Sequence, residues 1–370
     1  MSEMAFEGEQ WRLERARARF AEGEALPETL LPTPLARSWE RSRRAGLRPW
    51  QAPNYEALQP LGNPRAHPDD RRLAQAVGPE IEPLWAAFGG RDWTVFCVNP
   101  HGMIVRLRQH PESDRRLLRP LREGRRILEA DVGTTAPSCT LAEDRPALVR
   151  GHQHYLSTFA PMFCLSVPLH GLDRELVGAL DITGIGARET SLLLGHFRQA
   201  ALAAENRLYA GLRDCHLLRV QYDTRWTATP LHGLLAVRAD GSVRAANGLA
   251  RRLFALPRTG ALSALGLEQL FAAAVPAQRR RLLQRGAPWR LAMADGSAVC
   301  VEYLRPPLAS VPRRAAASPV AAAGPALREQ TLRTVAEALR LQGGNVAAAA
   351  RQLGISRTTL YKKLRAPPSP

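Results

Sequence analysis

Apolar positions recur at helical spacing through the last forty residues of the chain and predict three short helices there. The first covers 327–341. Asn345 is a suitable N-cap for a second helix over 346–353, and Ser356 is a suitable cap for a third over 357–364. The residues with the spacing to fill the core between the last two helices are Leu353, Ile355, Leu360 and Leu364. Two short helices joined by a tight turn predict a helix-turn-helix, whose second helix enters the major groove of DNA.

Alternating apolar stretches separated by turn signals predict two α/β domains upstream of this motif. The first closes with a long helix from Glu189 to about Leu212, whose apolar residues are core, a dimer seam or both. The second has a hairpin turn at Asp240-Gly241 and a helix over 248–254 that begins after Asn247. The predicted strands are 93–98, 103–107, 165–169 and 176–183 in the first domain, and 233–237, 243–246, 289–293 and 299–304 in the second.

The remaining sequence divides into a helical N-terminal region and a linker. Residues 11–46 have helical periodicity with a break over 26–34, and a helix over 35–47 begins after Pro34, a natural helix start. The stretch 305–325 is rich in Pro and Ala and predicts a semi-extended tether. The expected fold class is α+β and multidomain. Its parts are the helical region 1–70, the α/β domains 71–212 and 225–304, the linker 305–325 and the all-α domain 326–365.

Composition and charge narrow the classes of protein that fit this pattern. The chain has 370 residues and a formal net charge of +17, which favours an acidic partner such as nucleic acid. Its five cysteines are scattered without CxxC spacing, which favours reduced thiols. No run of about twenty apolar residues occurs, and the N-terminus lacks the apolar stretch of a signal peptide. We therefore expect a cytoplasmic protein of bacterial type without a membrane partner.

The third C-terminal helix has the side chains of a DNA-reading helix. It carries the only two lysines of the chain, Lys362 and Lys363, among other donors to phosphates and base edges. We expect Arg357 and Thr358 to reach bases, and Lys362, Lys363 and Arg365 to hold phosphates. The candidate DNA-binding residues are Asn345, Arg351, Ser356, Arg357, Thr358, Thr359, Tyr361, Lys362, Lys363 and Arg365. A helical hairpin that only dimerises the chain is the alternative interpretation.

The C-terminal stretch GGNVAAAARQLGISRTTLYKKL closely resembles the DNA-binding domain of the Fis family, whose typical pattern is GNxxxAAxxLGIxRxTLYxKL. The resemblance covers 326–365 and implies a homodimer on double-stranded DNA, with the helix 327–341 contributing to the dimer contact. The apolar stripe of that helix either forms part of the dimer contact or packs in the core of the domain. It consists of Leu332, Val335, Ala336 and Leu339.

Three other stretches are similar to the GAF sensor region of the acetoin-catabolism activators, a group of σ54-dependent regulators. They are SWERSRRAGL, DVGTTAPSCTLAEDRPALVRGHQHYL and FCLSVPLHGLDRELVGALDITG. The corresponding family patterns are SWxRCxxxGL, GTNAxGTxLxExRPVxVxGxxHxL and CxxAPIxDxxGxLxGVLDxSG. The resemblance implies a GAF fold over 71–212 that binds a small organic effector between its sheet and the loop crossing it.

This sequence departs from the family pattern in the expected ligand loop. Thr135 replaces the usual Asn, and Ser138-Cys139 falls where Gly-Thr is usual. The effector therefore need not be that of any relative. The residues that fold analogy places at the pocket are Thr134, Thr135, Cys139, His154, Phe163, Cys164 and Asp181.

The stretch GLLAVRADGSVRAANGLARRLFAL is similar to the start of a PAS domain, in which an Asn opens the helix after the first hairpin. A PAS-like domain over 225–304 would relay the signal or help to pair the subunits. An unrelated small α/β module is the alternative interpretation of this region.

Acetoin-type regulators normally carry an AAA+ ATPase between the sensor and the Fis domain, and this sequence shows no sign of one. A P-loop, G-x-x-x-x-G-K-[ST], requires a lysine, and no lysine precedes Lys362. The GAFTGA loop that contacts σ54 is absent, and 211–325 is shorter than the roughly 200 residues of an ATPase domain. We expect regulation without ATP hydrolysis, with RNA polymerase or another regulator as a further partner.

Other chemistry has little support in the sequence. His152 and His154, as His-x-His on a strand, could bind a metal, but a structural histidine is the commoner role. Cys164 could be a redox sensor, although inert buried thiols are commoner. No G-x-S-x-G, HExxH or dinucleotide motif occurs, so we expect no enzyme, metal or cofactor. The sequence thus predicts an effector-responsive transcription regulator. The rival is an adaptor whose helical tail docks on a partner regulator without contacting DNA.

Overall fold

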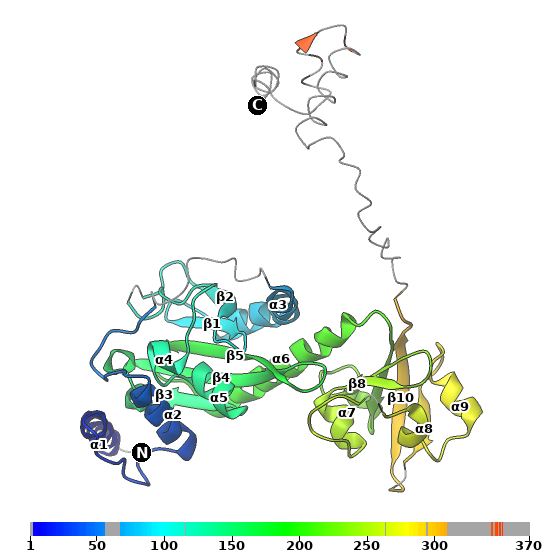
Figure 1. Cartoon of the computed structure of the whole chain (residues 1–370), viewed down its shortest axis with the longest axis horizontal. Helices are drawn as coiled ribbons and strands as arrows, with labels where there is room; N and C mark the ends of the chain where they lie inside the picture. Colours follow the sequence, from blue (N-terminus) through cyan, green and yellow to red (C-terminus); the bar gives the residue numbers. More distant parts are fainter. Residues whose placement is uncertain are drawn as a thin grey trace, which may run out of the picture. The chain divides into compact units, whose positions relative to one another are not determined.

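The computed structural model describes residues 3–55, 67–114, 116–262, 264–293 and 295–308, and positions 342, 345, 346, 348 and 350 near the C-terminus (Figure 1). The chain divides into two compact units, Met1–Ala309 and Ser310–Pro370. The first unit contains two five-stranded β-sheets with their covering helices. The fold class is therefore α+β, as the sequence predicts.

Two helices precede the first sheet. They are α1 (Glu3–Ala21) and α2 (Thr33–Arg44), separated by a break close to the predicted one. Pro34 lies in the first turn of α2, where its missing N–H removes no helical hydrogen bond. One side of α2 packs against the rest of the unit, and its buried residues are Leu35, Ser38, Trp39 and Ser42.

The first sheet has the strand order β2-β1-β5-β4-β3, and every neighbouring pair is antiparallel. Its strands are β1 (Trp93–Val98), β2 (Ile104–Gln109), β3 (Ala147–Arg150), β4 (Met162–His170) and β5 (Leu176–Ile185). The three central strands are buried along most of their length because helices cover both faces of the sheet.

Side chains alternate between the two faces of this sheet, so each face has its own core. Two long helices cover the face that carries Val95, Leu165 and Ile182. Two short helices, together with α1 and α2, share the core of the face that carries Phe96 and Cys164. The long helices are α3 (Pro68–Phe88) and α6 (Thr190–Ala210), and the short ones are α4 (Glu129–Val132) and α5 (Ala136–Glu143).

The second sheet is antiparallel with the order β8-β7-β6-β10-β9. Asn247 Oδ1 accepts a hydrogen bond from the Ala250 N–H at 2.9 Å, which confirms Asn247 as the N-cap of the following helix. Two of its three short helices, those over 248–253 and 267–270, contribute buried side chains to the core on one face of this sheet. The elements are β6 (His216–Gln221), β7 (Gly233–Val237), β8 (Val243–Ala246), α7 (Gly248–Leu253), α8 (Leu267–Leu270), α9 (Pro276–Arg281), β9 (Trp289–Ala292) and β10 (Ala298–Arg305).

The central strand β6 is an element that the sequence pattern does not predict. It pairs with both β7 and β10, although it precedes residue 225, the expected start of the second domain. Its six residues, HLLRVQ, neither alternate in polarity nor form an uninterrupted apolar run. Pairing with distant strands specifies β6, and the sheet therefore begins at His216.

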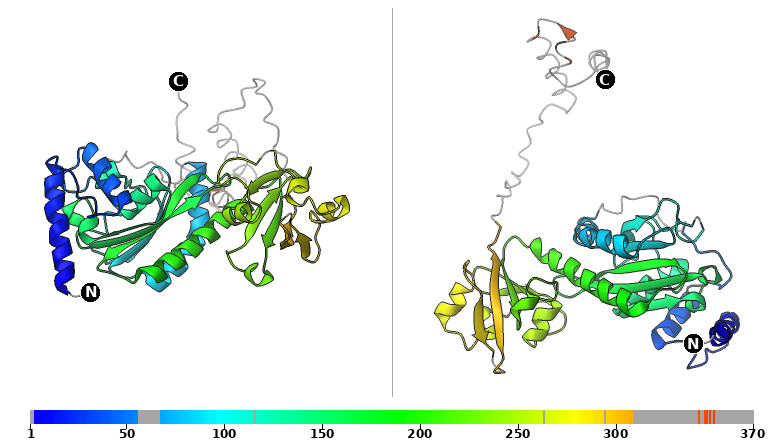
Figure 2. Two further views of the ribbon diagram at one scale, coloured as in Figure 1. Left: turned by 90° about the horizontal axis from the view of Figure 1, so that it is seen from below. Right: turned by 180° about the vertical axis from the view of Figure 1, so that it is seen from behind.

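The helix α6 connects the two sheets (Figure 2). Its residue Tyr209 lies in one apolar cluster with Leu217 and Leu234 of the second sheet. Arg305, the last residue of β10, donates to the carbonyl oxygens of Ala210 at 3.0 Å and Leu212 at 2.6 Å, which satisfies the C-terminal end of α6. Among the helices that the structure describes, none is long and apolar enough to cross a bilayer.

Candidate functional site

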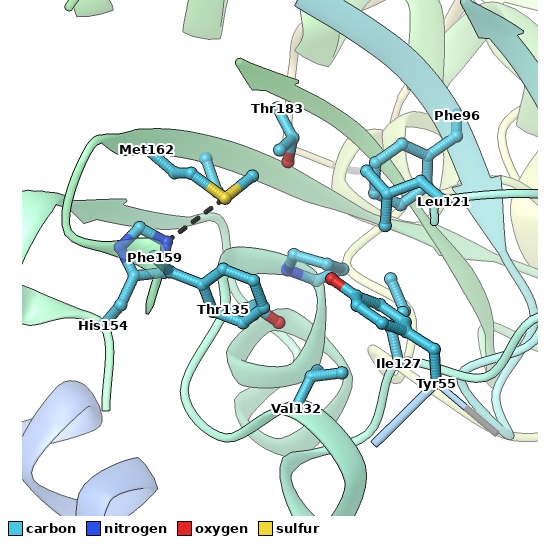
Figure 3. A pocket seen from close by; sticks show the side chains of 12 residues that line it. Tyr55, Phe96, Leu121, Ile127, Val132, Thr135, His154, Phe159, Met162 and Thr183 are labelled. Atoms are coloured by element: carbon cyan, nitrogen blue, oxygen red, sulfur yellow. Dashed lines mark hydrogen bonds between the residues drawn. The ribbon is translucent and has the colours of Figure 1, made fainter. Parts of the chain in front are cut away.

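A small cavity lies in the first domain between the sheet and the α4–α5 segment (Figure 3). Its volume is about 20 Å³, which is room for one water molecule. The lining residues are Tyr55, Phe96, Leu121, Ile127, Val132, Thr135, Pro137, His154, Phe159, Met162, Cys164 and Thr183. Three of the seven residues predicted to bind the ligand, namely Thr135, His154 and Cys164, are among them. Tyr55, Leu121 and Met162 come from stretches in which the sequence gives no signal.

Strand alternation decides which residues of the sheet face this cavity. Cys164 of β4 and Thr183 of β5 are register partners on the cavity face. Phe163 points into the opposite core, where its ring packs edge-on against Trp93 with 5.6 Å between the centroids. The structure thus moves Phe163 out of the predicted ligand site, because adjacent strand residues lie on opposite faces.

His154 lies on the cavity wall as an oriented, neutral imidazole. Its Nδ1 is 2.9 Å from the carbonyl oxygen of Gly151, which only accepts hydrogen bonds, so Nδ1 carries the proton. Nε2 is then the acceptor for the Cys164 thiol, whose Sγ lies 3.3 Å away. Burial lowers the pKa of His154 to about 4 and raises the pKa of the Cys164 thiol. Both side chains are therefore uncharged at neutral pH.

Thr135 caps a helix and Cys139 lies within it, whereas the sequence predicts a loop at both residues. Thr135 is the N-cap of α5, and its backbone N–H donates to Ser138 Oγ at 3.0 Å. Cys139 is buried within α5 in the core below that helix. Thr134 faces α2 instead of the cavity, since its Oγ1 lies within hydrogen-bond distance, 2.8 Å, of Ser38 Oγ. The capping residues Thr135 and Ser138 are the sequence signal for α5, which is too short to show apolar periodicity.

Asp181 is buried on the cavity face of β5 but does not line the cavity. Thr183 Oγ1 donates to Asp181 Oδ1 at 2.6 Å, and Oδ2 has no hydrogen-bond partner within the described residues. The carboxyl lies between Phe96 of β1 and Ser166 of β4 in the strand register. Burial raises the pKa of Asp181 well above its ordinary value and favours the protonated acid.

The electrostatics of the cavity select the class of molecule that it can hold. None of the residues that line it carries a charge at neutral pH, and the polar groups are hydroxyls, a thiol and the His154 ring. The Tyr55 hydroxyl points toward the enclosed space (Figure 3). An ion placed here would lose its hydration without gaining a partner. The arrangement therefore suits a small uncharged molecule with one or two hydrogen-bonding groups.

The helix α2 is bonded directly to the two short helices at the cavity. Arg41 Nε lies 2.5 Å from Glu129 Oε2 of α4, and Arg41 NH1 lies 3.0 Å from Glu143 Oε1 of α5. Ser38 Oγ donates to Glu129 Oε1 at 2.5 Å. Hydrogen bonding to Glu129 and Glu143 outweighs burial and raises the pKa of Arg41. This cluster fixes α2 on the wall of the cavity.

The N-terminal helices also hold the segment that carries His154. Arg17 of α1 donates through NH1 to the His154 carbonyl oxygen at 3.1 Å. Trp39 of α2 donates through Nε1 to the Gln153 carbonyl oxygen at 2.8 Å, and its ring packs against Tyr155. The sequence of this region predicts only an amphipathic helix. The Ser, Trp and Arg of its SWxR pattern make these contacts.

A second polar network leads from α5 toward the second domain. His170 Nε2 lies 2.7 Å from Asp144 Oδ1 at the end of α5, and His170 Nδ1 lies 3.0 Å from Glu205 Oε1 on α6. Arg174 donates to Glu205 Oε2 at 2.7 Å and packs against Gly248 at the start of α7. Burial opposes a charge on His170, but the hydrogen bond to Glu205 and the two carboxylates prevail and raise its pKa.

The two histidines of the His-x-His sequence occupy different environments. They lie at a 3₁₀ turn, Gly151–Gln153, and not on the strand that a shared metal-binding face would need. His154 is buried at the cavity, whereas His152 is partly exposed. No group of three potential metal ligands occurs among the described residues.

In the second unit, Asn345 Oδ1 accepts from the Ala348 N–H at 3.1 Å, which confirms the predicted N-cap. Val346, Ala348 and Ala350 are helical, and Ala350 is 2% exposed. The other candidate DNA-binding residues lie outside the described residues. They are Arg351, Ser356, Arg357, Thr358, Thr359, Tyr361, Lys362, Lys363 and Arg365.

Two protein families match segments of this chain. Residues 73–204 match the GAF domain, and residues 333–366 match the bacterial regulatory protein, Fis family. The chain thus carries a GAF domain and a Fis-family helix-turn-helix segment, as the sequence predicts. The cavity lies in the first of these segments, and every candidate DNA-binding residue lies in the second.

Relatives of the chain include two named transcriptional activators. The acetoin dehydrogenase operon transcriptional activator AcoR of Bacillus subtilis is 27% identical over 207 residues, which are 54% of this chain and 33% of AcoR. The propane 2-monooxygenase operon transcriptional activator MimR of Mycolicibacterium smegmatis is 24% identical over 198 residues, which are 53% of this chain and 33% of MimR. The match thus spans about a third of the length of each relative.

Among solved structures, the crystal structure of the E. coli DhaR(N)–DhaL complex contains a similar chain. The two chains are 16% identical, with a TM-score of 0.41, and the match covers 74% of this chain and 100% of the other.

Proposed function

We propose that this chain is an effector-responsive transcription regulator of the bacterial cytoplasm. It would bind double-stranded DNA as a homodimer through its Fis-type segment and sense a small uncharged molecule in its GAF domain. The observation that carries the proposal is a small cavity without charged lining residues in a GAF domain whose chain continues into a Fis-family helix-turn-helix segment. The names of AcoR and MimR as transcriptional activators support the same function.

The contacts around the cavity supply a physical route for the signal. A molecule larger than water must push apart the sheet and the α4–α5 segment, because the cavity holds only about 20 Å³. Glu129 of α4 and Glu143 of α5 would then move against Arg41 of α2. The end of α5 would move against His170, which contacts α6 and thereby the second domain. Effector binding would thus alter contacts at both ends of the first unit.

The proposed regulator acts without an ATPase of its own. No lysine precedes Lys362, so a P-loop cannot form between the GAF domain and the Fis-type segment. ATP-driven remodelling of σ54 polymerase therefore does not belong to the proposal. The DNA-bound dimer would instead act by contacting RNA polymerase or another regulator directly.

Lys363→Ala is expected to weaken binding to all duplex sequences alike. The salt slope of log affinity should fall by about one unit, because a phosphate contact is lost. Fluorescence anisotropy with a duplex from upstream of the chain's own operon, at several salt concentrations, measures this. Arg357→Ala is the comparison on the same helix and should relax preference at one base pair by about 1–3 kcal/mol. Salt-insensitive or absent binding by the parent chain would favour the adaptor that does not contact DNA.

Small uncharged molecules are expected to stabilise the chain and to change its affinity for the same duplex. Butanone and cyclohexanol serve as neutral probes, and butyrate and butylammonium as charged ones. The midpoint temperature of thermal unfolding should rise only with the neutral probes, because the lining residues offer no charge to pair with a charged probe. Val132→Phe, which narrows the cavity, should remove the shift. Equal stabilisation by the charged probes, or an unchanged shift in Val132→Phe, would contradict the assignment of the cavity.

A further inference from the structure

The second domain carries a local excess of arginine that the proposed function does not use. Between Asp240 and Asp295 the chain has nine arginines and one carboxylate, Glu268. The whole chain has 51 basic residues against 34 acidic ones. The average bias of the sequence therefore does not account for this region.

Some of these arginines have partners within the fold. Arg251 is 2% exposed and donates to three backbone carbonyls. Arg279 donates to the carbonyls of Phe271 and Ala274. Arg244 lies 3.0 Å from a carboxylate oxygen of Asp173. Packing and capping explain these side chains without a further partner.

Four other arginines near α9 and β9 are exposed, and we call them the arginine surface. Within the described residues, no carboxylate forms an ion pair with any of them, in contrast to Arg219, which pairs with Glu302 on the neighbouring strands. The four are Arg280, Arg281, Arg285 and Arg290. An external anion can therefore bind their guanidinium groups without first breaking an ion pair to a carboxylate of the described residues.

The arginine surface lies along α9, β9 and the connection between them. Arg281 Cζ lies 5.9 Å from the centroid of the Trp289 ring, which joins the end of α9 to β9. Arg285 lies in the connection between them and acts electrostatically on Tyr303 of β10. Arg290 is on β9, the edge strand of the sheet. A charged side chain on an edge strand can prevent the strand from pairing with another chain. That role would account for Arg290 but not for the other three arginines.

We infer that the arginine surface is a second contact for the phosphate backbone of the DNA that the helix-turn-helix holds. The guanidinium fork matches the oxygens of a phosphate in geometry and charge. The described part of the first unit ends at Leu308, directly after β10, and the Fis-family match begins at residue 333. The surface is thus close in sequence to the segment that positions the duplex.

The test compares two fourfold variants of the full chain that lose the same charge. One replaces Arg280, Arg281, Arg285 and Arg290 with Gln. The control replaces four exposed arginines of the first domain, which are Arg71, Arg91, Arg145 and Arg198. The probe is a labelled mixed-sequence duplex, and the readout is its affinity as a function of salt. Circular dichroism checks that both variants retain the parent fold.

The arginine-surface variant should lose about two to four units of salt slope and about tenfold or more in affinity at low salt. The control should lose less than one unit. Replacing the same four arginines with Lys should preserve most of the slope, because the charge remains. Equal losses in the two Gln variants would overturn the inference and leave the proposed function intact. A parent chain without affinity for the duplex at low salt would overturn both.

Discussion

Trp39→Ala is expected to lower the free energy of unfolding of the first unit by about 3–5 kcal/mol, the range for deleting a large buried aromatic side chain. Trp39 is 0% exposed, and its ring lies 6.1 Å from that of Phe20 and 5.9 Å from that of Tyr155 between centroids. Truncation would also leave the Gln153 carbonyl without its indole donor. Urea unfolding followed by far-UV circular dichroism measures the change.

Trp50→Ala is the matched control, because that side chain belongs to a residue that is 62% exposed. It should change the free energy of unfolding by less than about 0.5 kcal/mol. Trp39→Phe should lower the free energy of unfolding by an amount between those of the two Ala variants, since it keeps an aromatic ring and loses the indole N–H donor. Equal effects of Trp39→Ala and Trp50→Ala would mean that α2 is not anchored on the GAF domain. Loss of the neutral-probe shift in Trp39→Ala would indicate that the anchor also shapes the cavity.

The elements that could be predicted from the sequence are those with a local signal. The strands β1, β7 and β8 have the predicted limits, because turn residues flank short apolar runs. By contrast, β6 is defined by its pairing with the next strand, β7, and with β10, which is distant in the sequence. The helices α4 and α5 are too short for periodicity and depend on caps. Distant pairing and short capped helices are what a pattern of apolar positions cannot reveal.

The candidate site shows the same limit at the level of single residues. Family likeness points to the stretch Phe163-Cys164, but a strand directs neighbouring side chains to opposite faces. Only Cys164 can face the cavity, and Phe163 packs beside Trp93. Tyr55 reaches the cavity from an irregular segment before α3, and its approach depends on the tertiary fold. Sequence likeness therefore indicates which strand borders the cavity. The alternation of side chains along that strand determines which of its residues line the cavity.

The N-terminal helices change how the GAF domain is understood as a sensor. Ser38, Trp39 and Arg41 each bond to a segment that contributes a lining residue or flanks one. Residues 3–44 are thus part of the structure around the cavity, although the sequence suggests a separate helical region. A change in the cavity cannot leave α2 undisturbed unless these bonds break. The strength of the Arg41 cluster therefore determines how tightly α2 follows the cavity.

Arg41→Ala is expected to lower the free energy of unfolding by about 2 kcal/mol and to loosen α2 from the cavity wall. Removing it leaves Glu129 and Glu143, whose side chains are 12% and 15% exposed, without their main counter-charge. The effect should be smaller than the 3–5 kcal/mol typical of fully buried pairs, because the Arg41 side chain is 34% exposed and water screens it. Urea unfolding and limited proteolysis after α1 measure the two consequences.

Arg44→Ala on the same helix is the matched control, since its side chain is 74% exposed and pairs with Glu40 one turn away. It should change the free energy of unfolding by less than about 0.5 kcal/mol and leave proteolysis unchanged. Glu129→Gln should resemble Arg41→Ala in direction, because it removes the charge at the other end of the same pair. If Arg41→Ala and Arg44→Ala behaved alike, α2 would be held by Trp39 and its apolar neighbours alone. The polar cluster would then have no part in transmitting changes from the cavity.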